Sequence, residues 1–274
     1  HIFPGVTPQE AVKRVAAERI DAAKVVSTAA AQLVTLRAFI TSRDLVTLPG
    51  DDEATVMVTP PFMRYNSASL DQAGPFEEKS RVAFYYITPP DPSWSKEKQD
   101  GYLPYAADLM ATSIHEVYPG HFVHGLHQRR ARTRVQQAFA SYAFTEGWAH
   151  YAEQMMLDEG FGDGDARMRL GQLSNALLRN CRFLATLGLH AGDMSVDGAQ
   201  RLFQEQCFVD EGNAQQQAYR GTYDPGYLSY TLGKLQILAL RQRYQEKHGA
   251  GLKAFHDWLL GFGGAPLALL ERRL

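Results

Sequence analysis

The pattern of apolar and polar positions divides the chain into a helical lead-in, a short extended region and a long helical remainder. Residues 8–40 are rich in alanine, and after Pro8 they contain neither glycine nor proline. Thr7 precedes them as a helix N-cap, with Pro8 at the first helical position and Glu10 three residues after the cap. We therefore expect a helix to begin at Pro8 and to continue, as one long helix or two stacked ones, to about residue 40.

Two later segments are rich in β-branched and aromatic residues, namely 54–60 (ATVMVTP) and 81–89 (RVAFYYITP). The stretches 60–69 and 89–95 contain several prolines and serines and are predicted to be ordered loops. The pattern predicts a small antiparallel sheet of two or three strands. If 81–89 is an edge strand beside a binding site, an extended peptide could pair with its backbone.

Helical periodicity returns at about residue 103, in the segments 103–130, 134–159, 165–190, 195–208, 225–247 and 251–261. The predicted fold class is mainly α, a multi-helix bundle with the small antiparallel sheet inserted before the histidine-rich segment. We interpret 1–274 as one catalytic domain with a helical lead-in (1–50), a sheet with loops (51–102) and a helical metal-site region (103–274).

Composition narrows the possible partners of the protein. The 274 residues carry a net charge of −2, without the basic excess that a nucleic-acid partner usually requires. No apolar run approaches the length of a membrane span. The chain starts at His1 with no signal-peptide pattern, so we expect a processed product or the C-terminal part of a longer chain. The missing N-terminal portion or a second copy is then a candidate partner.

The two cysteines, Cys181 and Cys207, do not make a disulfide framework. They are compatible with a reducing compartment without establishing one. The sequence does not reveal a cytoplasmic or an exported location.

The segment HEVYPGH (115–121) resembles the zinc-peptidase motif HExxH with two additional residues. Histidines four residues apart lie about 40° apart on a helix, whereas a spacing of six turns His121 about 120° away from His115. Pro119 cannot donate a backbone hydrogen bond, and Gly120 admits backbone angles that other residues avoid. We therefore expect the helix to be interrupted between the two histidines, so that both can face one metal ion.

A third ligand is expected in the segment FTEGWAHYAEQM (144–155). Glu146 precedes Gly147, which would allow a close backbone approach, and Glu153 lies seven residues on, on the same helical face. Two histidines and a carboxylate leave a coordination position open for water, as in catalytic zinc sites. Glu116 would then be the general base, and Glu153 would orient a ligand histidine.

Other histidines and carboxylates in these segments leave alternatives open. His124 and His127 are expected to be structural, although a metal contact from His124 is conceivable. A helical two-metal site would use Glu116, Glu146, His150 and Glu153, but such sites favour Glu-x-x-His pairs. A third alternative is a partner-binding module without catalytic activity.

Five stretches together resemble a bacterial group, the "domain of unknown function 885" family, regarded as candidate metallopeptidases related to thermostable carboxypeptidases and angiotensin-converting enzyme. They are DPSWSKEKQDGYL (91–103), IHEVYPGHFVH (114–124), FTEGWAHYAEQM (144–155), RGTYDPGYLSYTLGKLQI (220–237) and FHDWLLGFGGAPLALL (255–270). Members are typically about twice as long as this chain, so it resembles a C-terminal half.

The resemblance implies a zinc-dependent hydrolase of peptides or related small amides, with one Zn²⁺ per chain. It implies His115, His121 and Glu146 as ligands and Glu116 as general base. It also directs attention to Tyr230, Arg220 and Tyr227, where a hydroxyl or guanidinium could stabilise an oxyanion.

Further candidates for substrate binding lie outside the metal motif. Arg182 and His190 belong to another family-like stretch, NCRFLATLGLH. Arg182 could bind a substrate carboxylate, but we expect a structural salt bridge in preference. Several tyrosines could line a substrate groove or belong to the core, namely Tyr85, Tyr86, Tyr118, Tyr223, Tyr227 and Tyr230.

Overall fold

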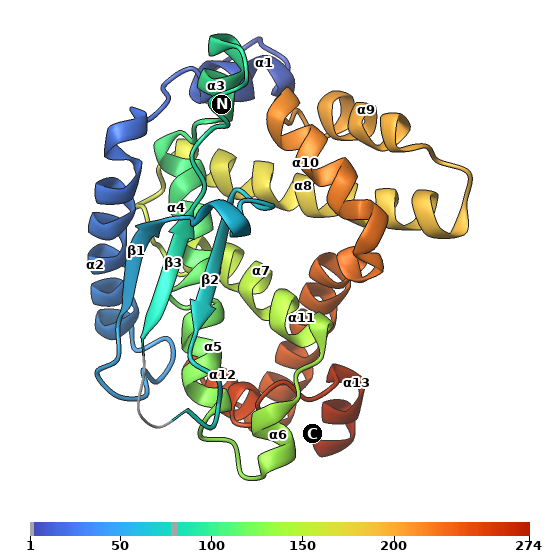
Figure 1. The fold of residues 1–274 in the computed structure, drawn as a ribbon. Helices are drawn as coiled ribbons and strands as arrows, with labels where there is room; N and C mark the ends of the chain where they lie inside the picture. The colour runs from blue at the N-terminus through green and yellow to red at the C-terminus, as the bar shows by residue number, and fades with distance from the viewer. Residues whose placement is uncertain (1–2, 78–81) are drawn as a thin grey trace.

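Helices make up most of the computed structural model, which describes residues 3–77 and 82–274 (Figure 1). The α-helices are α1 (Pro8–Ala16), α2 (Val25–Arg43), α3 (Lys96–Tyr102), α4 (Ala106–Glu116), α5 (His121–Gln128), α6 (Arg134–Ala138), α7 (Tyr142–Asp158), α8 (Ala166–Ala191), α9 (Val196–Gln206), α10 (Glu211–Tyr223), α11 (Ser229–His248), α12 (Leu252–Leu260) and α13 (Leu267–Leu270). The strands are β1 (Ala54–Val58), β2 (Ala68–Gln72) and β3 (Ala83–Ile87). The mainly α class predicted from the sequence is confirmed.

The helical lead-in consists of two helices. The backbone N–H of Glu10 donates to the Thr7 hydroxyl at 3.2 Å, so α1 begins at the predicted cap. One helix of the described residues, Ala22–Arg43, is long and apolar enough to cross a membrane by length and composition, contrary to the expectation of no such run. This is weak evidence for a span, because core helices pass the same test and α2 buries Ala29, Leu36 and Ile40 in the core.

The sheet is mixed, not antiparallel as the sequence analysis expected. Its strand order is β1-β3-β2, with β1 parallel and β2 antiparallel to β3. β2 arises in part from a stretch that was predicted to be a loop. β3 is therefore the central strand, with both backbone edges already paired, so the interpretation of 81–89 as an edge strand is wrong. Arg81 lies outside the described residues.

The helical segments also differ from the prediction in their division and number. Segment 103–130 is divided between α4 and α5, and segment 134–159 between α6 and α7. Helices α3, α10 and α13 were not predicted. Helix α10 begins at a clear cap, since Asp210 accepts from the backbone N–H of Asn213 at 3.0 Å. Its small and polar residues, EGNAQQQAYRGTY, obscure the apolar period on which the prediction relied.

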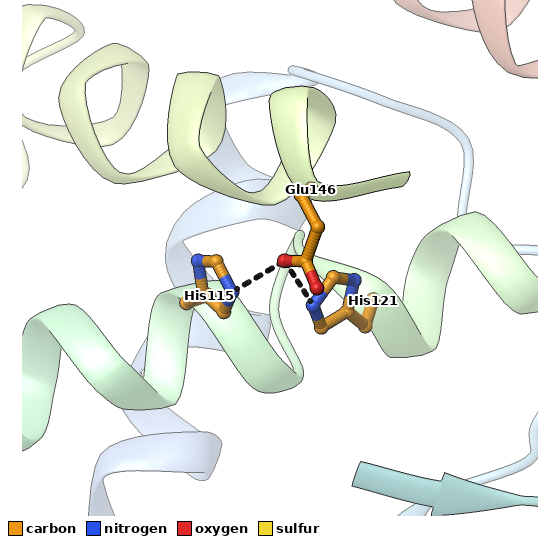
Figure 2. Close-up of side chains that lie close together, drawn as sticks. All are labelled: His115, His121 and Glu146. Carbon is orange, nitrogen blue, oxygen red and sulfur yellow. Dashed lines mark ion pairs between the residues drawn. The ribbon is translucent and has the colours of Figure 1, made fainter. Parts of the chain in front are cut away.

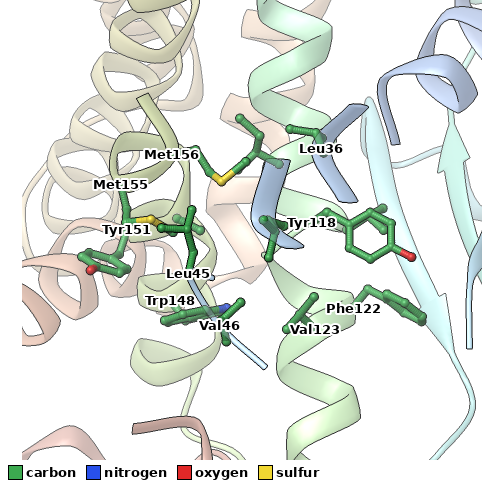
Figure 3. Packing of buried hydrophobic residues seen from close by; sticks show 14 of the residues in the cluster. Leu36, Leu45, Val46, Tyr118, Phe122, Val123, Trp148, Tyr151, Met155 and Met156 are labelled. Carbon is green, nitrogen blue, oxygen red and sulfur yellow. The ribbon is translucent and has the colours of Figure 1, made fainter. Parts of the chain in front are cut away.

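The main core lies between α2, α5 and α7 (Figure 3). Trp148 of α7 is fully buried there, and its indole N–H donates to the carbonyl of Pro119 at 2.9 Å. A Cβ on Gly147 would lie 2.5 Å from the backbone of Gly233 in α11, so the two helices pack at a glycine contact. The predicted close approach at Gly147 is confirmed, and it fixes the position of α7 behind the α4–α5 segment.

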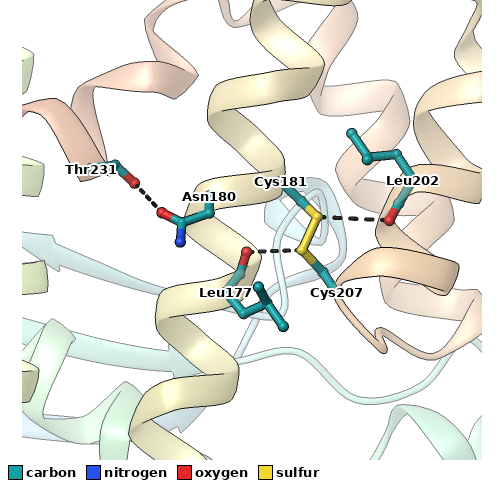
Figure 4. Close-up of a disulfide and its surroundings, with 6 residues drawn as sticks. All are labelled: Leu177, Asn180, Cys181, Leu202, Cys207 and Thr231. Carbon is teal, nitrogen blue, oxygen red and sulfur yellow. Dashed lines mark hydrogen bonds between the residues drawn. A yellow bond between two sulfur atoms is a disulfide. The ribbon is translucent and has the colours of Figure 1, made fainter. Parts of the chain in front are cut away.

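Cys181 of α8 and Cys207 at the end of α9 form a disulfide, with their Cα atoms 6.4 Å apart (Figure 4). The sulfur atoms lie against the carbonyl oxygens of Leu202 and Leu177, but a disulfide sulfur carries no proton to donate. The two cysteines are 26 residues apart, and only the packing of α9 on α8 brings them together. Disulfides persist mainly in oxidising compartments, so the paired cysteines do not support the reducing compartment with which the sequence was compatible.

Candidate metal centre and active site

The chain between the two motif histidines leaves the helix. Helix α4 ends at Glu116, the Tyr118–Pro119 peptide bond is cis, and α5 begins at His121. The backbone N–H of Gly120 donates to the carbonyl of Ile114 at 3.0 Å, a bond that no regular α-helix contains. The predicted interruption between His115 and His121 is therefore confirmed.

Gly120 is required at this break for two reasons. Its φ of −67° is negative but its ψ of −130° lies outside the helical and extended regions, so its backbone angles are ones that other residues avoid, as predicted. A Cβ at this position would also lie 1.7 Å from the carbonyl oxygen of His115, a contact that no side chain can make. The absence of a side chain at residue 120 is thus what lets α5 start directly against the end of α4.

This break places the two imidazole rings against each other, with centroids 4.7 Å apart. Glu146 of α7 points between them (Figure 2). Its Oε2 lies 3.3 Å from Nε2 of His115 and 3.2 Å from Nε2 of His121. Tetrahedral zinc ligands at about 2.0–2.1 Å from the ion are separated by about 3.3–3.4 Å. The two distances from Glu146 therefore suit one small cation, and all three ligand atoms lie within 4.8 Å of one another.

Two atoms of this cluster lack hydrogen bonds despite their burial. Oε2 of Glu146 and Nδ1 of His121 are buried and have no hydrogen-bond partner among the described residues, although Oε2 lies within ion-pair distance of both histidines. A buried carboxylate oxygen without a donor is costly. A cation bound by the three side chains would remove this cost at Glu146.

The electrostatics of the cluster favour positive charge at its centre. Burial alone would raise the pKa of Glu146, but His121 and His115 hold it well below its usual range. Burial would likewise lower the pKa of His115, but Glu146 and Glu153 raise it to about 9. Among the described residues, this is the one group of histidine, cysteine and carboxylate side chains close enough to hold a metal.

Glu153 lies behind His115, one layer further from the cluster. Nδ1–H of His115 donates to Glu153 at 2.7 Å, which leaves Nε2 directed at the cluster. Arg179 of α8 donates to the same carboxylate at 2.9 Å, so the carboxylate is both buried and neutralised. Burial opposes ionisation, but Arg179 and the neighbouring histidines hold the pKa of Glu153 well below its usual range. These contacts suit Glu153 to hold His115 in a fixed orientation. Because its carboxylate is already bonded and neutralised, it is poorly suited to bind a second metal together with His150.

Glu116 shares a cavity of about 200 Å³ with the three-residue cluster. It is the last residue of α4, and among the described residues no side chain donates a hydrogen bond to its carboxylate. The opposite wall of the cavity comes from β2 and the segment before it, over residues 66–70. A carboxylate without a side-chain donor that lines the same cavity as the cluster is a candidate general base.

Tyr230 and Arg220 lie together on another wall of this cavity. The Tyr230 ring stacks on His115 at 6.1 Å, and its hydroxyl accepts from Arg220 at 3.1 Å, which leaves the phenolic proton available. Burial and the charge of Glu146 raise the pKa of Tyr230. Arg220 also donates to Asp224, Asn66 and Tyr142, so most of its N–H groups are already used. The arrangement makes Tyr230 the hydrogen-bond donor toward the cavity and Arg220 the residue that positions it.

Arg182 lines the same cavity from α8. Its Nε–H donates to Gln217 of α10 at 2.8 Å. The guanidinium carbon lies 4.7 Å from the ring centre of Tyr230 and 5.0 Å from that of Tyr227. The expected structural salt bridge is absent among the described residues. Tyr227 is fully buried and donates its own hydroxyl to Gln217 at 2.6 Å, so it supports Arg182 instead of facing the cavity.

Four other candidates lie away from the cavity lining. Tyr118 packs against Phe122 in the core. His190 bonds the carbonyl of Gly221 at 2.8 Å and joins α8 to α10. His124 bonds the carbonyl of Gly263 at 3.0 Å, and burial lowers its pKa to about 4, while His127 bonds the carbonyl of Thr47 at 2.8 Å. The structural interpretation of these two histidines is confirmed.

Several residues of the site were not predicted from the sequence. Arg179, Gln217, Tyr142 and Asp224 each hold a predicted residue in place, and they come from α8, α10, α7 and the segment after α10. Arg179 could have been predicted, because it lies three residues before Arg182 on the same helix. Nothing local in the sequence indicates the other three, because their partners are distant along the chain.

The fold and the cluster together define a mainly helical protein with a candidate His–His–Glu metal centre in a buried cavity. A family profile described as "Bacterial protein of unknown function (DUF885)" matches residues 3–274, so the chain belongs to this family. Comparison with curated proteins found no match.

Two solved structures share this fold. A "putative lipoprotein of unknown function" from Shewanella oneidensis aligns with a TM-score of 0.83 and 27% identity, over 97% of this chain and 48% of that one. A "putative lipoprotein" from Colwellia psychrerythraea aligns with a TM-score of 0.76 and 25% identity, over 91% of this chain and 42% of that one. The chain therefore spans less than half the length of either similar structure.

Proposed function

We propose that this protein is a zinc-dependent hydrolase that cleaves peptide or related amide bonds. The observation that carries the proposal is the meeting of three metal-ligand atoms, from His115, His121 and Glu146, beside the free carboxylate of Glu116 in one cavity. Two histidines and one carboxylate are a donor set typical of catalytic zinc, with a position left open. The buried, unbonded Oε2 of Glu146 fits the same interpretation.

The chain's own residues supply the remaining functions of a hydrolytic site. A zinc ion in this position would supply Lewis acidity and would lower the pKa of water to about 7. Glu116 would accept a proton from the attacking water and later pass it to the leaving nitrogen. Tyr230 donates its hydroxyl to the oxygen of the carbonyl under attack, and Arg220 keeps that hydroxyl in place.

Replacement of Glu116 tests this assignment. Glu116→Gln preserves size but cannot accept the proton, so hydrolysis of a peptide library should fall by about 10²–10⁴-fold. The variant should still contain about one zinc per chain by elemental analysis, because Glu116 is not a ligand in this proposal. Glu246→Gln, an exposed carboxylate on α11, is the matched control.

The other possible outcomes separate the alternatives. Loss of zinc from Glu116→Gln would make Glu116 a ligand and overturn its role as base. Two redox-active metals per wild-type chain would favour the two-metal enzyme. A wild-type chain without metal or hydrolysis would favour the partner-binding module.

A further inference from the structure

Three arginines line the cavity, Arg179 and Arg182 buried and Arg220 half-buried, and two of the three have carboxylate partners. Arg179 pairs with Glu153 at 2.9 Å, and Arg220 pairs with Asp224 at 3.0 Å. Arg182 is also buried, with 7% of its surface exposed, yet it forms no ion pair among the described residues. A buried charge without a partner is costly, so its retention in a cavity calls for an explanation.

The surroundings of Arg182 hold its guanidinium in one orientation. Gln217 fixes Nε, and the rings of Tyr227 and Tyr230 lie against the guanidinium carbon. Such cation–π contacts compensate part of the desolvation. The two terminal nitrogens have no hydrogen-bond partner among the described residues, and both keep some accessible surface. They form a preoriented fork, a shape that matches a carboxylate.

From these contacts we propose that Arg182 binds a carboxylate of the substrate, one or two residues beyond the bond that is cut. Arg182 and His115 both contact the ring of Tyr230, at 4.7 Å and 6.1 Å from its centre. Both residues also line one cavity, so a short substrate bound across it can reach from the cluster to Arg182. The inference rests on the proposed function, and it adds a substrate class: short peptides or amides with a carboxylate on the leaving side.

Matched peptides identify the source of that carboxylate. The zinc-loaded chain would be given N-acetyl-tetra-alanine, its C-terminal amide, and amides with aspartate at the last or the penultimate position. We expect the free acid to be cleaved about 10–100-fold faster than the plain amide, measured as kcat/KM by mass spectrometry. If an amide that contains aspartate is cleaved as fast as the free acid, a side-chain carboxylate serves as well as a terminal one.

Arg182→Met should remove this preference mainly through KM, so that the free acid and the plain amide are cleaved with similar kcat/KM. Arg182→Lys keeps the charge without the fork and should restore part of the preference. Arg243→Met, at an exposed arginine of α11, is the matched control and should behave as wild type. An acid-to-amide ratio that is the same in Arg182→Met as in wild type would overturn the inference.

A binding measurement keeps the inference testable without hydrolysis. Calorimetry on zinc-loaded Glu116→Gln should show N-acetyl-dialanine binding at least about tenfold more tightly than its amide, and the added Arg182→Met change should abolish the difference. Equal affinities would refute the carboxylate site even if hydrolysis is observed. If hydrolysis is not observed but the acid still binds more tightly than the amide, the proposed function is refuted and the carboxylate site is supported.

Discussion

Tyr230 contacts a candidate ligand histidine, three arginines and the cavity through one side chain. Its ring lies against His115, Arg179 and Arg182, and its hydroxyl accepts from Arg220. Because the oxygen already accepts from a cation, its own hydrogen is more strongly polarised. A donor of this kind suits the oxyanion stabilisation that the proposed function assigns to Tyr230.

Removal of that hydroxyl should slow the chemical step without weakening substrate binding. We expect Tyr230→Phe to lower kcat by about 10²–10³-fold with little change in KM, because the hydroxyl bonds to charge that develops in the transition state. The measurement is steady-state kinetics on the best-cleaved peptide. Tyr219→Phe, at an exposed tyrosine of α10, controls for loss of a phenolic group. A rise in KM with kcat unchanged would assign Tyr230 to binding instead.

At this scale, the residues of the candidate metal cluster could be predicted and the contacts of their neighbours could not. His115, His121 and Glu146 lie in short motifs whose residue types indicate metal binding. Arg182 was expected to form a salt bridge, since most buried arginines do. Whether a carboxylate stands opposite an arginine depends on α10 and the neighbouring tyrosines, which are distant along the chain.

At the scale of helices and strands, the segment between α4 and α5 determines how the side chains of the candidate site are arranged. Residues 117–120 stop one helix and start another, and the start of α5 lies against the carbonyl groups at the end of α4. The indole of Trp148 bonds the Pro119 carbonyl and so ties this break to α7, which carries Glu146. The three ligands are thus connected through the break itself.

Gly120→Ala should therefore damage the metal centre as well as the fold. A methyl group 1.7 Å from the His115 carbonyl oxygen forces α4 and α5 apart. We expect a loss of stability of at least about 1–3 kcal/mol, the usual cost of overpacking, together with loss of most bound zinc. Urea unfolding and elemental analysis would measure the two effects.

Gly251→Ala is the comparison for this change, because a Cβ there meets no atom within 4 Å. Full zinc occupancy in Gly120→Ala would show that the close approach at residue 120 is not what aligns the ligands.

At the scale of the whole molecule, a buried histidine joins distant parts of the chain. Nδ1–H of His256 in α12 donates to the carbonyl of Leu45 at 2.7 Å, and its Nε2 accepts from Tyr151 of α7 at 2.8 Å. Arg241 of α11 donates to the same tyrosine hydroxyl at 3.2 Å. These bonds require the neutral ring, and burial lowers the pKa of His256 to about 4.

This network predicts a loss of stability in mild acid. The unfolded chain binds a proton at His256 near pH 6.5, whereas the folded chain resists protonation until about pH 4. The contribution of His256 is therefore complete above pH 6.5 and declines as the pH falls toward 4, by up to about 3 kcal/mol. Urea unfolding of wild type and His256→Gln at pH 7.5 and pH 5 would test this.

The variant will be less stable at both pH values, but it should lose less between them than wild type does. His248→Gln, at an exposed histidine of α11, should keep the wild-type pH dependence. An identical decline in His256→Gln and wild type would exclude His256 as a source of the acid sensitivity.

The sequence by itself determined the features that arise from neighbouring residues. The mainly helical class, the cap at Thr7, the break at Pro119 and Gly120 and the types of the candidate ligands all follow from short stretches. Only the tertiary structure decided the mixed sheet, the Cys181–Cys207 pair and the unpaired state of Arg182. It also placed Glu146 between the histidines, through the glycine contact of α7 with α11. Such features depend on which distant segments pack together, and a local pattern of residue types carries no information about that choice.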